Sequence, residues 1–248
     1  MRKNVLISFF LLPAYLLVFC FPVKAASLKG SESIRILIIP QEETVLSSEI
    51  AASIQQLSVD FGERFTKGQT LIEFDCQNYK SELKKAQAEL LEATKTLKAN
   101  TRLRELKSVS ELDVAVSEAR VDRAKAEVEL KSNIVSKCSI AAPFSGRVLQ
   151  RDANLFQYVT PGQPLIKVID NVNLVVQLFV PSHWLTWLKT GLRFTVQIDE
   201  TKKTYQAELT VIGAKVDQVS QTIEIRAKMT ATHPELLAGM SGTAYFKK

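Results

Sequence analysis

A ten-residue segment occurs twice, first as Phe65-Thr66-Lys67-Gly68-Gln69-Thr70-Leu71-Ile72-Glu73-Phe74 and again, 94 residues later, as Val159-Thr160-Pro161-Gly162-Gln163-Pro164-Leu165-Ile166-Lys167-Val168. In each copy a turn leads into an apolar run typical of a short strand. The glycine at the same place in both turns allows the positive φ at which a chain can reverse direction. The duplication predicts two similar β units that form one small sandwich with pseudo-twofold symmetry.

The similarity continues upstream of the repeated turn. Ile54 aligns with Val148, Gln56 with Gln150, and Phe61 with Leu155. We expect strands over residues 52–59 and 69–74 in the first half, and over 146–151 and 163–169 in the second.

Between the two copies the apolar period changes from two to about 3.6, and Gly and Pro are absent from Asn78 to about Asn133. The stretch is rich in Ala, Leu, Glu and Lys, which favour helices. Two runs with a seven-residue repeat are separated by a break near 107–110; they comprise Leu83, Leu90 and Leu97, then Val114, Val121, Val128 and Val135. This pattern predicts two antiparallel helices packed as a coiled coil, the first about 29 residues and ~43 Å long.

The same stretch indicates where the second helix begins and whether the two helices pack against the β structure. Ser110, followed three residues later by Asp113, resembles a capping box. Each helix has one narrow apolar stripe, whereas a helix folded onto the body needs a wider apolar face. We therefore expect an arm that stands out from the β structure; the alternative is a helical bundle packed against it.

Two cysteines lie at the predicted base of this arm. Cys76 follows the last strand of the first half, and Cys138 precedes Ser139, which opens the second half. Neighbouring strand ends can bring two Cα atoms within about 6 Å, as a disulfide requires. We expect a Cys76–Cys138 disulfide that stabilises the fold by on the order of 4 kcal/mol; the alternative is two unpaired thiols.

The C-terminal third returns to the alternation of strands. We expect strands over 174–180, 193–198, 204–215, 222–231 and 243–246, which indicate a small β-barrel. A short helix over 183–189 carries Trp184, whose apolar side we expect to close one end of the barrel. His183 and His233 lie far apart without other ligands at metal-binding spacing, so we expect surface or capping roles for both and no metal site.

The N-terminus has the features of a secretory signal peptide. A short basic start precedes the apolar run from Val5 to Phe21, and Ala25 and Ala26 suit cleavage. The alternative is an uncleaved membrane anchor. Removing residues 1–25 takes away three basic residues and no acidic one, so the net charge falls from +6 to +3. This weakens a nucleic-acid-binding interpretation.

Three further motifs have a recognisable order: Ile140-Ala141-Ala142-Pro143-Phe144-Ser145-Gly146-Arg147-Val148, then Val159-Thr160-Pro161-Gly162-Gln163-Pro164-Leu165, then Leu237-Ala238-Gly239-Met240-Ser241-Gly242. With the split repeat, this order resembles the periplasmic adaptors of tripartite efflux systems, the membrane fusion proteins of the HlyD type, including the adaptor subunits of RND pumps. Ala238 departs from the Pro of the family motif. The resemblance covers nearly the whole chain after the signal peptide.

The resemblance implies a mostly β fold with an α-helical coiled-coil hairpin. Its parts would be a signal peptide at 1–25, a split lipoyl-like domain (a barrel-sandwich hybrid) at 34–76 and 138–170, a helical hairpin at 77–137 and a β-barrel domain at 171–248. Many members carry a further membrane-proximal domain built from both chain ends. We expect that domain to be absent here, so that transporter contacts fall mainly on the barrel.

The resemblance also implies the function. Such an adaptor works in the periplasm, bridging an inner-membrane transporter of the RND or ABC type and an outer-membrane channel, and self-associates into a ring of six copies. The family's tip motif is Arg, three residues, Leu, six residues, Ser. Arg102 and Leu106 match it, whereas Asp113 replaces the Ser. We expect these three residues to bind the partner at the tip; the alternative is that they only cover the end of the hairpin.

Two other functions compete with this one. Lipoyl and biotinyl carrier subunits share the split sandwich, but they bear a modified Lys between the halves, where this chain has Phe74-Asp75-Cys76-Gln77-Asn78 and the predicted arm. Lys80, which follows, belongs to the predicted helix. A purely structural coiled-coil protein is the third possibility. We expect no enzyme activity and no cofactor, because the chain contains no Gly-x-Ser-x-Gly, His-Glu-x-x-His or phosphate-binding glycine motif.

Overall fold

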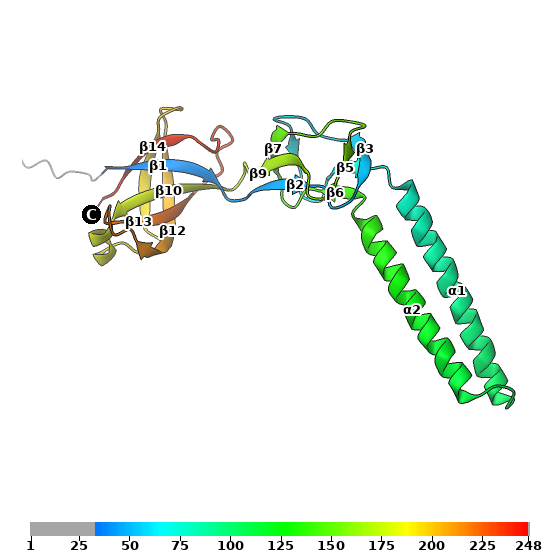
Figure 1. Ribbon diagram of the computed structural model, residues 1–248. Helices are drawn as coiled ribbons and strands as arrows, with labels where there is room; N and C mark the ends of the chain where they lie inside the picture. Colours follow the sequence, from blue (N-terminus) through cyan, green and yellow to red (C-terminus); the bar gives the residue numbers. More distant parts are fainter. Residues whose placement is uncertain (1–32, 248) are drawn as a thin grey trace, which may run out of the picture.

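The computed structural model describes residues 33–247, and the predicted signal peptide at 1–25 lies outside the described residues. Three parts follow one another in space: a closed β-barrel, a unit of two small sheets, and two long helices that leave the far end of the second part (Figure 1). The fold is therefore mostly β with one helical projection.

The barrel contains six antiparallel strands in the closed order β1-β10-β13-β12-β11-β14. Its core is a continuous cluster of inward-facing apolar residues that includes Ile38, Val176 and Ile225. The strands are β1 (Ser33–Pro40), β10 (Leu174–Pro181), β11 (Arg193–Ile198), β12 (Thr204–Val216), β13 (Thr222–Met229) and β14 (Ser241–Tyr245). The barrel predicted from the C-terminal third is present, and it includes one further strand, β1, from the N-terminal part of the described chain.

That additional strand corrects one predicted boundary. The split sandwich was expected to begin at residue 34, but β1 pairs with β10 and β14, so residues 33–40 belong to the barrel. Without β1 the sheet would have open edges at β10 and β14, whose unpaired backbone groups would need other partners. The barrel is thus closed by the two ends of the described chain, with Ser33 opposite Tyr245.

An aromatic cluster closes the barrel end that lies away from the two-sheet unit. Trp184 is buried and packs against Phe246 and Trp187, with ring centroids 5.1 Å apart in both cases. The expected plug is confirmed, but its helix differs: only a 3₁₀ turn forms, η1 (Ser182–Thr186), rather than a helix over 183–189. Trp187 leaves the helical region with φ −128° and ends the turn, while Trp184 within it is buried over the core.

The two-sheet unit combines strands from both halves of the repeat. One sheet has the order β2-β9-β7-β4 and the other β6-β5-β3-β8. The strands are β2 (Glu43–Ser47), β3 (Ala52–Leu57), β4 (Arg64–Phe65), β5 (Thr70–Phe74), β6 (Ser139–Ala141), β7 (Gly146–Arg151), β8 (Tyr158–Val159) and β9 (Pro164–Ile169). Corresponding strands β3 and β7 have the same burial pattern, as the predicted pseudo-twofold relation requires.

Glycines explain two of the sequence motifs. Gly68 and Gly162 occupy the repeated turn with φ of 81° and 83°, which favours glycine in both copies. Gly146 has another reason: a Cβ at this position would collide with the carbonyl oxygen of Ile169 on the neighbouring strand. The motif around residues 140–148 therefore contains a glycine where β7 and β9 come very close.

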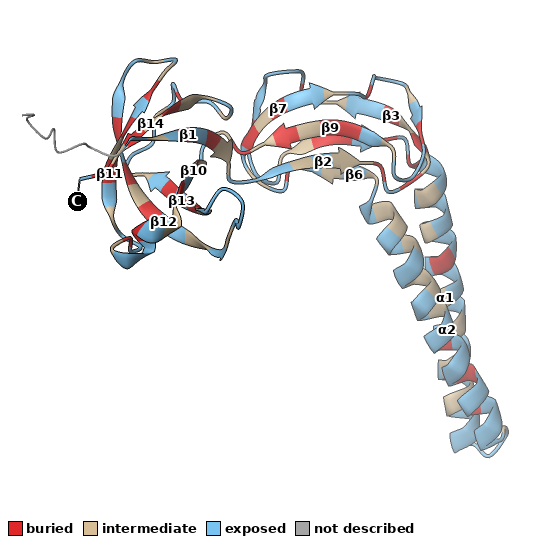
Figure 2. Cartoon of the chain, turned by 60° about the vertical axis from the view of Figure 1, so that its left-hand side comes forward, coloured by how far each residue is buried: buried red, intermediate tan, exposed pale blue. Residues whose placement is uncertain are grey.

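The helices are α1 (Gln77–Glu105) and α2 (Glu111–Ser136), which pack along each other and against no other element to a comparable extent within residues 33–247. We call them the helix pair. The residues of their shared seam are buried or intermediate, whereas most other residues of both helices are exposed, as the colouring of the ribbon in Figure 2 shows. The seam residues are Leu83, Ala86, Leu90, Ala93, Leu97 and Asn100 on α1, and Val114, Ser117, Val121, Ala124, Val128, Lys131 and Val135 on α2.

Candidate functional site

The free end of the helix pair, where α1 turns into α2, carries exposed apolar side chains. α1 ends at Glu105, Leu106 caps it, and Lys107 takes φ 57° to turn the chain towards α2. Leu106 and Leu112 are 68% and 72% exposed, which is unusual for two leucines so close in sequence. Exposed leucines among charged residues at a free helix end form a surface suited to protein contact.

Arg102 and Leu106 lie one helical turn apart at this tip, as their spacing predicts. The backbone N–H of Leu106 donates to the carbonyl oxygen of Arg102 at 3.3 Å. The guanidinium of Arg102 is exposed and forms no ion pair or side-chain hydrogen bond with the residues that the structure describes. It can therefore donate charge-assisted hydrogen bonds to carbonyl or carboxylate oxygens of a partner. No partner is present, so a binding role for these two residues stays a prediction.

Asp113 has a different environment from the other two predicted site residues. Its Oδ2 accepts hydrogen bonds from the Ser110 N–H at 3.0 Å and the Ser110 hydroxyl at 2.6 Å, and its own N–H donates to Ser110 Oγ at 3.2 Å. These bonds, first of all the one from the hydroxyl, lower the pKa of the Asp113 carboxyl. The predicted capping box is confirmed, and the carboxylate already has a structural use at the start of α2.

Leu112 was missed by the sequence reasoning. It lies outside the seven-residue repeat, between the cap residue Ser110 and the seam residue Val114. That off-repeat position next to a helix start was the available signal. With Leu106 and the partly exposed Leu103 it gives the tip three large apolar side chains.

A polar pair across the seam was also missed. Asn100 donates from Nδ2 to Ser117 Oγ at 2.7 Å, and Ser117 Oγ donates to the carbonyl oxygen of Asp113 at 2.8 Å. Ser117 is only 2% exposed. A polar contact buried in a largely apolar seam favours one register of the two helices.

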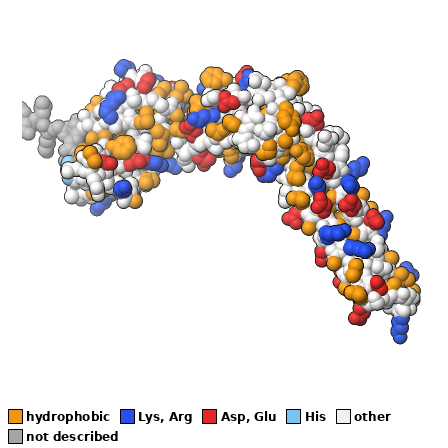
Figure 3. Space-filling view, in the orientation of Figure 1, with side chains coloured by type: hydrophobic (Ala, Val, Ile, Leu, Met, Phe, Trp, Pro, Cys, Tyr) orange, Lys and Arg blue, Asp and Glu red, His pale blue; other side chains and the backbone are white. Residues whose placement is uncertain are grey.

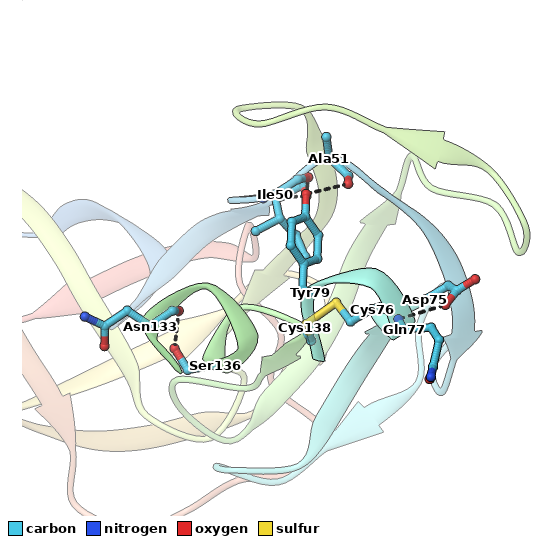
Figure 4. Close-up of a disulfide and its surroundings, with 10 residues drawn as sticks. Ile50, Ala51, Asp75, Cys76, Gln77, Tyr79, Asn133, Ser136 and Cys138 are labelled. Carbon is cyan, nitrogen blue, oxygen red and sulfur yellow. Dashed lines mark hydrogen bonds between the residues drawn. A yellow bond between two sulfur atoms is a disulfide. The ribbon is translucent and has the colours of Figure 1, made fainter. Parts of the chain in front are cut away.

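The base of the helix pair is tied to the sheets by a disulfide, shown in Figure 4. Cys76 and Cys138 are bonded, with their Cα atoms 6.0 Å apart, so the predicted pairing is present. Cys76 is also the residue that precedes α1, where its side chain makes no capping hydrogen bond. The bond therefore joins the two points at which the chain enters and leaves the helix pair.

Two noncovalent contacts reinforce this base. The hydroxyl of Tyr79 on α1 donates to the carbonyl oxygen of Ala51 at 3.0 Å (Figure 4). Lys137, at the end of α2, forms an ion pair with Glu49 at 2.8 Å. Each helix thus has its own contact with the segment between β2 and β3, so the direction of the helix pair is fixed on both sides.

Residues considered for other functions lie apart from these features. Lys80 is in the first turn of α1, as expected, rather than in a turn between strands. His183 is in η1, and His233 packs edge-on against Tyr205 with ring centroids 4.6 Å apart. Within residues 33–247, no group of three or more His, Cys, Asp or Glu side chains is arranged to hold a metal, and no helix is long and apolar enough to span a bilayer.

Comparison with known proteins gives distant relatives. No family model matches the chain. It is 26% identical over 206 residues to an uncharacterized protein of Haemophilus influenzae, covering 82% of this chain and 54% of that protein. It is 25% identical to the macrolide export protein MacA of Yersinia pestis, covering 80% and 62%. The chain thus spans between about half and two thirds of these curated relatives.

Solved structures share the whole arrangement. The membrane fusion protein Spr0693 of Streptococcus pneumoniae matches with a TM-score of 0.73 at 15% identity, covering 88% of this chain and 99% of that one. A chimera of MacA with the α-hairpin domain of Pseudomonas aeruginosa MexA matches with a TM-score of 0.72 at 23% identity, covering 86% and 79%. The fold of this chain is therefore the fold of membrane fusion proteins.

Proposed function

We propose that this chain is a periplasmic adaptor of a tripartite efflux or secretion system, bridging an inner-membrane transporter and an outer-membrane channel through its helix pair. The names of two similar proteins, a macrolide export protein and a membrane fusion protein, support this proposal. In it the chain is exported by its signal peptide, is not an enzyme and uses no cofactor.

One observation carries the proposal: the helix pair projects from the sheets with its tip free (Figure 1). Helix α1 has 29 residues, which corresponds to a length of about 43 Å. A long, narrow projection buries little apolar surface and adds little to the stability of the fold. Because the projection adds little to stability, its length and exposed tip are best explained by contact with a distant partner.

The other parts take their roles from this geometry. In the proposal β2 to β9 form the split lipoyl-like domain, with the helix pair as a coiled-coil hairpin inserted between its halves. The barrel, at the opposite end of the molecule, contacts an RND-type or ABC-type transporter. Arg102 and Leu106 contact the outer-membrane channel, and copies of the chain assemble into a ring, as the resemblance implies.

Shortening the helix pair tests the bridging role. The variant lacks one heptad from each helix at matching height, namely residues 82–88 of α1 and 125–131 of α2. The deletion removes both members of the Glu82–Lys131 ion pair and keeps the seven-residue spacing of the seam. It shortens the projection by about 10 Å. We expect the shortened chain to fold but to leave its host as sensitive to toxic compounds as a strain that lacks the gene.

The matched control keeps the length and changes only the sequence. In this control, residues 82–88 and 125–131 are replaced by heptads with the same seam residues and different outer residues. It should restore resistance fully. Full resistance with the shortened chain would contradict the proposal.

A further inference from the structure

The barrel and the two-sheet unit lie end to end, as Figure 1 and Figure 3 show, and a cleft of about 350 Å³ lies at their junction. Residues from the segments 64–69 and 145–146 of the two-sheet unit, 171–172 of the connection to β10 and 232–234 of the barrel line it. We call it the junction cleft. Its volume and its place between two folded parts are typical of small-molecule sites, which measure ~300–1,000 Å³.

The lining of the junction cleft combines apolar surface with cationic and neutral polar side chains. Val172, which is 54% exposed, and Pro234 supply the exposed apolar surface. Arg64 lines the cleft from the two-sheet unit and His233 from the barrel, and no acidic residue of the described chain lines it. Such a lining suits a compact ligand that carries a negative charge on an apolar body.

Arg64 has a second arginine beside it. It lies opposite Arg147 in the antiparallel pairing of β4 with β7, so the two side chains leave the same face of the sheet. Neither arginine forms an ion pair or a side-chain hydrogen bond within residues 33–247, and the Nε atom of Arg147 is buried without a partner. Like charges directly opposite each other destabilise a sheet. An anion bound beside the two guanidinium groups offsets this repulsion.

The acidic side chains next to the junction cleft in the sequence have other partners. Glu63 Oε2 accepts a hydrogen bond from a backbone N–H of its own turn at 2.7 Å. Glu235 Oε1 accepts one from the hydroxyl of Tyr205 at 3.2 Å. Asp170 is buried, and its Oδ1 accepts from the backbone N–H groups of residues 172–173 at 2.8 and 2.9 Å. These carboxylates are therefore not available to pair with Arg64.

The sheet face of the two arginines carries one ion pair at its far edge. Arg147 lies opposite Ile169 on β9, and Ile169 lies opposite Glu43 on β2, so Glu43 is two strands away from Arg147. Glu43 pairs instead with Lys167 at 2.6 Å. Glu42, which precedes β2, is exposed and does not line the junction cleft. This face therefore keeps an excess of positive charge next to the cleft.

We infer that the junction cleft binds a small molecule in which an oxyanion, either a carboxylate or a phosphate, is attached to an apolar body. The guanidinium of Arg64 donates charge-assisted hydrogen bonds to the oxyanion, and Arg147 adds attraction from the neighbouring strand. The apolar body packs against Val172 and Pro234. Because such a ligand contacts both parts, its binding holds the barrel to the two-sheet unit. The inference does not depend on the bridging function.

Three probes of similar shape test this site by calorimetric titration of the full chain, as its host exports it: naphthoate, naphthyl phosphate and the neutral naphthamide. At least one of the two anions should bind at a single site, at least about tenfold more tightly than naphthamide, because charge-assisted hydrogen bonds are the stronger ones. Which anion binds more tightly distinguishes a carboxylate ligand from a phosphate ligand. Amide resonances should shift on both sides of the cleft, in residues 66–69 and in residues 232–233.

A matched pair of variants tests the role of the arginine. Arg64→Gln should weaken the binding of the anion at least about tenfold and leave that of naphthamide unchanged, because it removes the charge and keeps a polar side chain. Arg104→Gln removes the same charge from an exposed position on α1 and should bind all three probes as the wild type does. Thermal unfolding checks that both variants fold.

Four results would overturn the inference. They are equal affinity for the anions and naphthamide, equal behaviour of the two variants, resonance shifts confined to one side of the cleft, and no binding of any probe at millimolar concentration. If no probe binds and Arg64→Gln nevertheless lowers the resistance of the host, the two arginines contact an acidic protein surface instead. The shortened helix pair leaves the junction cleft unchanged, so the bridging function is tested separately.

Discussion

Asn100 and Ser117 meet across the seam of the helix pair, where Asn100 Nδ2 donates to Ser117 Oγ at 2.7 Å. Both residues lie close to the tip: Asn100 is two residues before Arg102 on α1, and Ser117 is four residues after Asp113 on α2. Because this polar contact is satisfied in one register only, it fixes the height of Arg102 relative to the start of α2. The seam thus determines the geometry of the predicted binding residues.

Two substitutions of Asn100 should distinguish its effect on the free energy of unfolding from its effect on the register of α1 against α2. Asn100→Ala should lower the free energy of unfolding by about 1 kcal/mol, the usual value of a hydrogen bond. Asn100→Leu should unfold at the same or a higher temperature, since an apolar residue suits the seam, yet it should relax the register. Thermal unfolding measures the first effect and hydrogen exchange at residues 106–113 the second. Unchanged exchange in Asn100→Leu would remove the register role.

The disulfide at the base should contribute to stability only when formed. Cys76→Ser opens a bond between residues separated by 62 positions, for which loop entropy predicts a loss on the order of 4 kcal/mol. The melting temperature of the variant should be lower than that of the wild type under oxidising conditions and equal to it in reductant. An equal shift under both conditions would mean that the thiols act by packing alone.

Asp113 should make the start of α2 sensitive to acid. Its carboxyl has a folded pKa below the ordinary value of 3.8, so the capping contribution is present above that value and is lost as pH falls through the folded pKa. The stability difference between wild type and Asp113→Asn should therefore be constant near neutrality and shrink in acid. Denaturant unfolding at a series of pH values measures it. A difference that persists in strong acid would contradict the role of the charge.

Reversing charge at the tip should abolish function without affecting the fold. Arg102→Asp changes an exposed side chain that has no described partner, so folding and secretion should stay normal while the host loses resistance to exported compounds. Lys98→Asp, one turn earlier on α1 and also exposed, is the matched control and should retain resistance. Equal behaviour of the two variants would mean that Arg102 has no specific role.

The features that were predictable have local signals. The repeat places turn glycines 94 residues apart, and the seven-residue pattern of Leu83, Leu90 and Leu97 marks the seam. The cap at Ser110 depends on a side chain three residues away. Each turn, each helix and the cap is formed by residues close together in the sequence, so the sequence pattern alone predicts these elements.

The features that were missed depend on distant contacts. The alternation in β1 indicates a strand but not which sheet it joins, and only pairing with β10 and β14 decides this. The spacing from Ala86 and Ala93 places Asn100 in the seam, but only the packing of the two helices shows that Ser117 is its hydrogen-bond partner. Arg64 and Arg147 lie far apart in the sequence, and only the pairing of β4 with β7 places them opposite each other.

Photo-crosslinking in living cells tests the central claim most directly. A crosslinking amino acid is placed at Leu106 at the tip or at Val219, which is 96% exposed in the β12–β13 turn of the barrel. The account predicts that Leu106 captures an outer-membrane protein and that Val219 captures only inner-membrane proteins or other copies of the chain. Capture of the same partners from both positions, or no outer-membrane partner from Leu106, would contradict it.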